Sequence, residues 1–150
     1  MAAKKIGAQL VGKEALQRTF SLLDLRAKAA FRDICQDSAM AVQRVAKERC
    51  PVRKDPADKV GGRLRGSIMI RFYNNGLTAE VGTNVEYAAF VEFGTGRRGA
   101  GAGLQSVPPE YAYGSSAGMN AQPYLWPALE AERPKFIARV RSEVGRGFGI

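Results

Sequence analysis

The sequence predicts a fold that combines long helices with an antiparallel β-hairpin, and three observations indicate it. Residues 13–49 place apolar side chains three and four positions apart with no Gly or Pro among them, which is the period of a helix. Residues 67–73 and 77–83 flank Asn75-Gly76, a pair that favours a two-residue hairpin turn. A second helical pattern follows Pro127. The 150 residues have the length of one domain, which we expect to span residues 1–150.

The N-terminal region is predicted to be a loose, flexible arm over residues 1–12, followed by a long helix over residues 13–49 that ends before Pro51. Unbroken, this helix would be ~55 Å long, which is longer than a compact domain is wide, so we expect a break near residues 21–25. A coiled coil is the alternative interpretation. The apolar step that is missing near Ser38 argues against a long one.

The register of the hairpin follows from its turn. With Asn75-Gly76 as a two-residue loop, Ile70 faces Val81 and Arg71 faces Glu80. The Arg71–Glu80 pair then lies on one face, and the other face is apolar. The apolar positions are Ile68, Ile70, Phe72, Ala79 and Val81. The preceding residues 51–66 are charged and rich in turn formers, so they are predicted to be a loop.

Residues 85–93 are predicted to form a short buried helix, because nearly every side chain in this segment is apolar. Thr83 or Asn84 can cap its start, and Gly94 can end it with a left-handed backbone. Glu92 is the unusual residue of the last turn. If it is buried it needs a partner, whereas the alternative is an exposed position at a rim. The candidate partners are Arg63, Arg65 and Arg71.

Residues 95–121 form a long Gly-rich loop, and loops of this length are uncommon in a compact domain unless they are functional or disordered. The segment 122–127 then introduces the last helix. Pro134 is expected to kink or restart this helix, and Gly145 and Gly147 are expected to end it. Its apolar stripe consists of Phe136, Ile137, Val140 and Val144.

The composition argues against several kinds of functional site. The chain has no histidine, which removes Ser–His and Cys–His nucleophile pairs and the commonest metal ligand. Cys35 and Cys50 are predicted to be free thiols, because a continuous helix would separate them by ~22 Å. We therefore expect no enzyme activity, no metal and no cofactor. We also expect that the protein does not associate with a membrane, because the chain has no long apolar run. We expect that it is made and kept in a cytoplasm, because it has no signal-peptide pattern.

The net charge of +9 is concentrated in residues 1–65, which carry 15 Lys/Arg and 7 Asp/Glu. A basic region of this kind can face nucleic acid or an acidic protein surface. One functional hypothesis is therefore a basic DNA-binding module without catalytic activity. The simpler interpretation is a solvated helix face that is rich in Lys and Arg.

Three motifs, in a fixed order, carry a resemblance to a known family. The segment Gly62-Arg-Leu-Arg-Gly-Ser-Ile68 opens the first strand, Tyr87-Ala-Ala-Phe-Val-Glu-Phe-Gly-Thr95 follows the hairpin, and Gln122-Pro-Tyr-Leu-Trp-Pro-Ala128 precedes the last helix. Over residues 12–145 the chain resembles small morphogenesis proteins of tailed bacteriophages. The family is the gene-product-ten-like group of tail-completion, head–tail joining or neck proteins.

The resemblance implies an α+β fold in which the N-terminal and C-terminal helices pack on a small antiparallel sheet. It implies a structural virion protein that forms a ring of about six copies in the neck and completes the tail or joins it to the head. The expected partners are copies of the chain itself, the head-closure or connector protein, and the tail-terminator or tube protein. Genome DNA would pass through the ring's channel without sequence-specific binding. The expected location is the virion, after synthesis in the cytoplasm of the host bacterium.

Aromatic side chains near the motifs are the candidate contact residues of such a ring, because aromatic anchors dominate many interfaces. Internal packing is the alternative for Phe90, Phe93 and Trp126. The Gly-rich loop and the basic arm are hypothesised to carry contacts between rings. The candidates for subunit contacts are Tyr87, Phe90, Glu92, Phe93, Tyr124 and Trp126. The loop candidates are Arg97, Arg98, Tyr111 and Tyr113.

Overall fold

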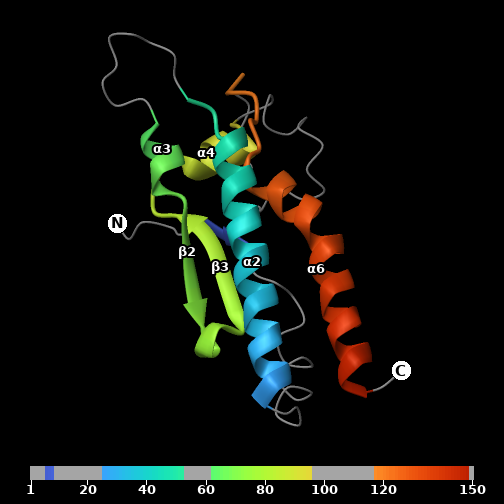
Figure 1. Cartoon of the computed structure of the whole chain (residues 1–150). Coiled ribbons are helices and arrows are strands. Elements are labelled where there is room, and N and C mark those ends of the chain that lie inside the picture. Colours follow the sequence, from blue (N-terminus) through green and yellow to red (C-terminus); the bar gives the residue numbers. More distant parts are fainter. Residues whose placement is uncertain (1–5, 9–24, 53–61, 96–116, 149–150) are drawn as a thin grey trace.

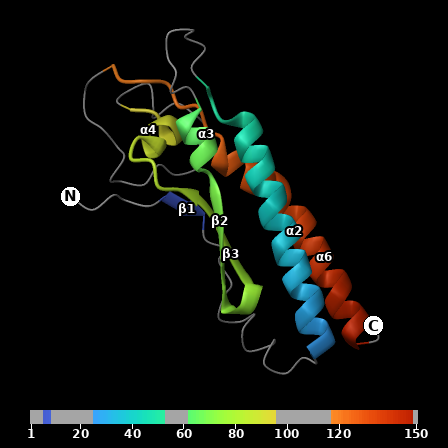
Figure 2. The same cartoon turned by 60° about the vertical axis from the view of Figure 1, so that its left-hand side comes forward.

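The computed structural model describes residues 6–8, 25–52, 62–95 and 117–148. Helices and an antiparallel sheet form separate layers, which is the predicted α+β arrangement (Figure 1). Helix α2 (Leu25–Arg49) lies along the sheet, and helix α6 (Leu125–Phe148) runs antiparallel beside α2 (Figure 2). The apolar core lies between α2, the sheet and the first turn of α6.

Helix α2 ends at Arg49, as predicted, because the residue before Pro51 is disfavoured in a helix. The predicted helical segment 13–24, and with it most of the predicted break, lies outside the described residues. In the described part, buried side chains recur mostly every three or four residues and form one stripe, whose C-terminal half belongs to the apolar core. They are Phe31, Cys35, Ser38, Ala39, Val42 and Ala46.

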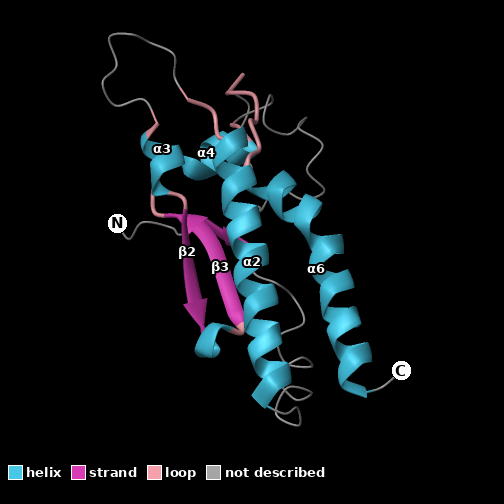
Figure 3. Cartoon of the chain, in the orientation of Figure 1, coloured by secondary structure: helices cyan, strands magenta, loops and turns pink. Residues whose placement is uncertain are grey.

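Strands β2 (Met69–Tyr73) and β3 (Thr78–Thr83) form the predicted hairpin (Figure 3), and the cross-strand pairs confirm the predicted register. The cross-strand pairs include Ile70 with Val81, Arg71 with Glu80, and Phe72 with Ala79. The first strand begins later than expected, because helix α3 (Arg63–Ser67) replaces the end of the predicted loop. This single turn of helix buries Leu64 in the core and leaves Arg63 and Arg65 exposed.

The hairpin turn has the predicted residues at its centre. Asn75 (φ 56°) and Gly76 (φ 84°) both have positive φ, and the N–H of Leu77 donates to the carbonyl oxygen of Asn74 at 3.2 Å. Asn74 also has positive φ, so it leaves the extended conformation within the 3₁₀ element η1 (Asn74–Gly76). As a result the ladder ends one pair earlier than predicted.

Phe72 is the exception on the predicted apolar face, because it is 44% exposed. Ile68 on the same face is buried, and Ile70 is half-buried. The physical reason is the position of α2, which packs more closely on β3 than on β2. The side chain of Phe72 therefore lies on an outer strand, near the turn, where the helix gives little cover.

Residues 6–8 were expected to belong to a loose arm, and this expectation is wrong for them. Strand β1 (Ile6–Ala8) pairs antiparallel with β3, so that Gly7 faces Gly82 and the strand order is β1-β3-β2. A three-residue strand has little propensity of its own. Pairing instead satisfies backbone N–H and C=O groups that β3 would otherwise leave open on this side.

Helix α4 (Ala88–Phe93) is shorter than the predicted helix over residues 85–93. The predicted cap by Thr83 or Asn84 is wrong, because Tyr87 is the N-cap residue and no side chain caps the helix; Thr83 Oγ1 instead accepts the N–H of Val85 at 3.2 Å in the turn before it. Gly94 (φ 72°) ends the helix with positive φ. The expectation that α4 is buried all round is wrong. Ala88, Ala89 and Glu92 are buried, but Tyr87 and Phe90 are exposed.

Helix α6 continues through Pro134 and extends to Phe148, past both glycines that were expected to end it. An internal proline costs about 3 kcal/mol, but contacts on both sides of it favour a single helix. Ala128 packs in the core before Pro134, and Arg139 binds Ser38 of α2 after it. Pro127 lies in the first turn, as predicted.

Candidate functional site

Glu92 links helix α4 to the start of helix α6. Its side chain is 2% exposed, and its carboxylate accepts three backbone N–H groups. Oε2 accepts those of Tyr124 (2.9 Å) and Leu125 (3.0 Å), and Oε1 accepts that of Trp126 (2.7 Å). The first N–H groups of a helix have no partner within the helix, and the positive end of the helix dipole lies there. Glu92 therefore caps α6 from more than thirty residues away in the sequence.

This arrangement settles the two alternatives for Glu92. The residue is buried, not exposed at a rim, and the partners of its carboxylate are backbone amides instead of the arginines considered from the sequence. A carboxylate that accepts several backbone N–H groups makes charge-assisted hydrogen bonds, which are stronger than neutral ones. The motifs around Glu92 and Tyr124 are thus in direct contact.

Further backbone contacts join the same two segments. The N–H of Gln122 donates to the carbonyl oxygen of Val91 at 2.8 Å. Thr95 and Met119 exchange backbone hydrogen bonds of 2.9 and 3.0 Å, and Met119 N–H also reaches Thr95 Oγ1 at 2.9 Å. The segments that end at Thr95 and begin near Met119 therefore lie side by side.

Tyr124 packs in the apolar core and is 1% exposed. Burial raises the pKa of its hydroxyl above the ordinary value near 10, and the nearby charge of Glu92 raises that pKa further. Tyr124 therefore stays neutral over the usual pH range and serves as a core residue of the single chain.

The six residues proposed for subunit contacts divide by exposure. Tyr124 and Glu92 are buried within the chain, and Phe93 is half-buried. Tyr87, Phe90 and Trp126 are between 36% and 42% exposed, and we call these three the aromatic group. They lie on the two segments that Glu92 joins. Arg97, Arg98, Tyr111 and Tyr113, the loop candidates, lie outside the described residues.

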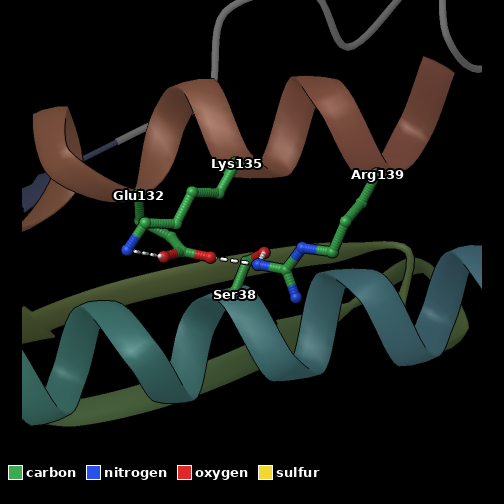
Figure 4. Close-up of polar contacts among 4 residues, drawn as sticks. All are labelled: Ser38, Glu132, Lys135 and Arg139. Carbon is green, nitrogen blue, oxygen red and sulfur yellow. Dashed lines mark hydrogen bonds and ion pairs between the residues drawn. The ribbon is translucent and has the colours of Figure 1, made fainter. Parts of the chain in front are cut away.

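A second buried carboxylate, that of Glu132, lies on α6 and binds Arg139, which in turn contacts α2 through Ser38 (Figure 4). Arg139 Nη2 donates to Glu132 Oε1 and also to Ser38 Oγ at 2.9 Å. Lys135 Nζ lies 3.5 Å from Glu132 Oε2. The sequence contained one signal for this cluster: Ser38 is polar at a place where the period of the first helix calls for an apolar residue.

We also searched the described residues for metal ligands, reactive thiols and membrane-spanning helices. These residues contain no group of three or more potential metal ligands. Cys35 and Cys50 are free and buried, and burial raises the pKa of both thiols. None of the helices in the described ranges is long and apolar enough to span a membrane.

Comparison with known protein families gives a match. Residues 14–94, more than half of the chain, match the model of the HK97-gp10-like family, described as "Bacteriophage HK97-gp10, putative tail-component". The matched segment includes α2, the hairpin and Glu92, but not α6. No curated protein and no solved structure matches the chain.

Proposed function

Because the chain belongs to the HK97-gp10-like family of phage proteins, we propose that it is a structural virion protein that forms a ring in the neck of a tailed phage. Such a ring would complete the tail or join it to the head around a channel for the genome. Its neighbours would be the head-closure or connector protein on one side and the tail-terminator or tube protein on the other.

The observation that carries this proposal is the aromatic group. Tyr87, Phe90 and Trp126 remain substantially exposed although they lie on segments that the chain holds firmly in place. Large aromatic side chains on rigid elements are typical anchors of protein interfaces, because little conformational entropy is lost when they become buried. They are therefore our candidates for contacts between copies.

The first test is the solution mass of the purified protein, measured by light scattering at two salt concentrations. We expect a discrete assembly of about six chains of 16.2 kDa. Trp126→Ala should shift this assembly towards monomer while the circular dichroism spectrum stays unchanged. The matched control is Ile137→Ala, which also removes an exposed apolar side chain from α6. An unaltered assembly in Trp126→Ala would remove the aromatic group from the ring interface.

The Gly-rich loop is proposed to contact the adjoining ring. Deleting residues 97–117 retains the Thr95–Met119 contact, so we expect a folded protein that assembles but does not complete particles. Infectious particles from a phage with this deletion would contradict this part of the proposal.

DNA contact is the second candidate, supported by the net charge of +9 and by three exposed arginines near one end of the fold. They are Arg49 at the end of α2, and Arg63 and Arg65 on α3. Binding to duplex DNA should be independent of sequence and should weaken steeply with salt. An affinity that does not change between 50 and 200 mM salt would contradict this electrostatic contact.

A further inference from the structure

Strand β2 lies at the edge of the sheet. The strand order is β1-β3-β2, and within the described ranges β2 pairs with β3 alone. Its outer edge therefore presents backbone N–H and C=O groups that another strand could pair with.

The side chains of β2 are unusual for an exposed edge. Met69, Phe72 and Tyr73 are 36%, 44% and 45% exposed. Met69 and Tyr73 lie on one face of the sheet and Phe72 lies on the other, so apolar surface flanks the edge on both sides. Soluble proteins usually protect an edge strand with Lys, Pro or a bulge, but β2 has neither Lys nor Pro and carries a single charge, at Arg71.

A neighbouring copy offers two candidate strands for this edge. One is β2 of a two-fold related copy. A full-length antiparallel pair of β2 strands would place Arg71 directly opposite Arg71 of the other copy, and like charges at opposite positions are destabilising. This charge argues against a two-fold dimer through β2.

The other strand is β1, at the opposite side of the same sheet. Its outer edge differs in sequence from that of β2, so pairing β2 with β1 of the next copy joins two unlike surfaces. Repeated head-to-tail contacts between unlike surfaces generate a ring when the rotation between copies closes and a filament when it does not, whereas like-to-like contacts generate dimers. Both strands are antiparallel to β3 and so run in the same direction, which suits a ring whose axis follows the strands.

We propose that β2 of one copy pairs with β1 of the next copy, so that one continuous sheet runs around the ring. This inference rests on the proposed ring and names the strands that close it. Backbone pairing would provide the affinity, and burial of Phe72 and Tyr73 would add apolar contact.

Cysteine cross-linking tests the pairing directly. Gly7→Cys and Arg71→Cys place thiols on β1 and β2, which β3 separates by about 10 Å within one chain, too far for an internal disulfide. Mild oxidation of the double variant should give a ladder of covalent multimers on a denaturing gel. Native Cys35 and Cys50 are buried, so the unmodified protein should give none.

The outcomes separate this proposal from the proposed function. If the unmodified protein forms a ring but the double variant gives no multimers, the strand pairing is wrong and the ring stands. If Arg71→Cys alone gives dimers, the contact is two-fold and the proposal is wrong. If the unmodified protein is monomeric at every concentration tested, the ring and the pairing both fail.

A substitution at the edge provides an independent measurement. Phe72→Lys should raise the protein concentration required for half-maximal assembly at least about tenfold, because a charge on the edge opposes strand pairing. Met40→Lys, which changes an exposed apolar residue of α2, is the matched control and should have no effect. Equal assembly of Phe72→Lys and Met40→Lys would overturn the proposal.

Discussion

Glu92 and Glu132 are both buried carboxylates, yet the structure stabilises them in different ways. Glu92 binds three backbone N–H groups of a segment more than thirty residues away. Glu132 binds two side chains of its own helix, Lys135 and Arg139. The first carboxylate depends on the relative positions of two elements, whereas the second is largely satisfied within α6.

The difference indicates which contact holds the fold in one arrangement. Backbone amides cannot move away without unwinding the start of α6, so Glu92 fixes α4 and α6 relative to each other. Arg139 is 37% exposed at its side chain and can reorient, so the cluster around Glu132 tolerates change. We therefore expect changes at Glu92 to have larger effects than changes at the second cluster.

The largest expected effect is that of Glu92→Ala. It leaves three amide groups of a helix start without partners, and we expect a loss of about 3 kcal/mol in the free energy of unfolding. Urea denaturation measures this loss. Glu86→Ala, an exposed change on the same segment, is the control and should stay within about 0.5 kcal/mol of the unmodified protein. Equal stability of the two variants would refute the capping role.

Arg139→Ala should have a smaller effect, about 1–2 kcal/mol, because Lys135 remains near Glu132 and water can reach the site. Thermal unfolding followed by circular dichroism is the measurement. Arg133→Ala, which removes an exposed ion pair with Glu130, should change stability by less than about 0.5 kcal/mol. A loss for Arg139→Ala as large as that for Glu92→Ala would contradict the comparison.

Alkaline pH should lower the stability of the region around Glu92, because Tyr124 lies near this carboxylate. The folded pKa of Tyr124 is raised above its unfolded value near 10, so its contribution to stability is fully present below pH 10 and is lost as the pH rises further. The expected loss approaches about 1.4 kcal/mol per pH unit above pH 10. Urea unfolding between pH 8 and 11 should show a smaller slope in Tyr124→Phe, which removes the titrating hydroxyl. Arg139→Ala should keep the slope of the unmodified protein.

The smallest expected effect is that of Ser38→Ala, about 0.5–1 kcal/mol, because Arg139 loses one neutral acceptor and retains Glu132. Combined with Arg139→Ala in a double-mutant cycle, it should add almost nothing, since both changes remove the same hydrogen bond. Full additivity would show that Ser38 and Arg139 act independently.

Local patterns in the sequence predicted the elements whose structure depends on near neighbours. Asn75-Gly76 and the alternation around it were sufficient for the register of the hairpin, and Pro51 was sufficient for the end of α2. The same patterns could not predict β1, because three residues carry almost no strand signal and pair only where β3 offers an edge.

The candidate site was predicted less well, because its geometry depends on distant residues. The sequence drew attention to Glu92 but gave no means of finding amide partners more than thirty residues away. It placed Phe72 on the apolar face correctly, yet its exposure depends on how far α2 extends across the sheet. The effect of Pro134 was overestimated, since packing on both sides of it favours a continuous helix.

The contact between Thr95 and Met119 makes the segment between these residues a suitable site for inserting a peptide tag. The backbone segments at Thr95 and Met119 are held side by side by their own hydrogen bonds. The entropy of closing a flexible insert grows only with the logarithm of its length, so a tag of a few tens of residues placed between them should leave the fold intact. In assembled particles such a tag would mark every copy of the protein for electron microscopy.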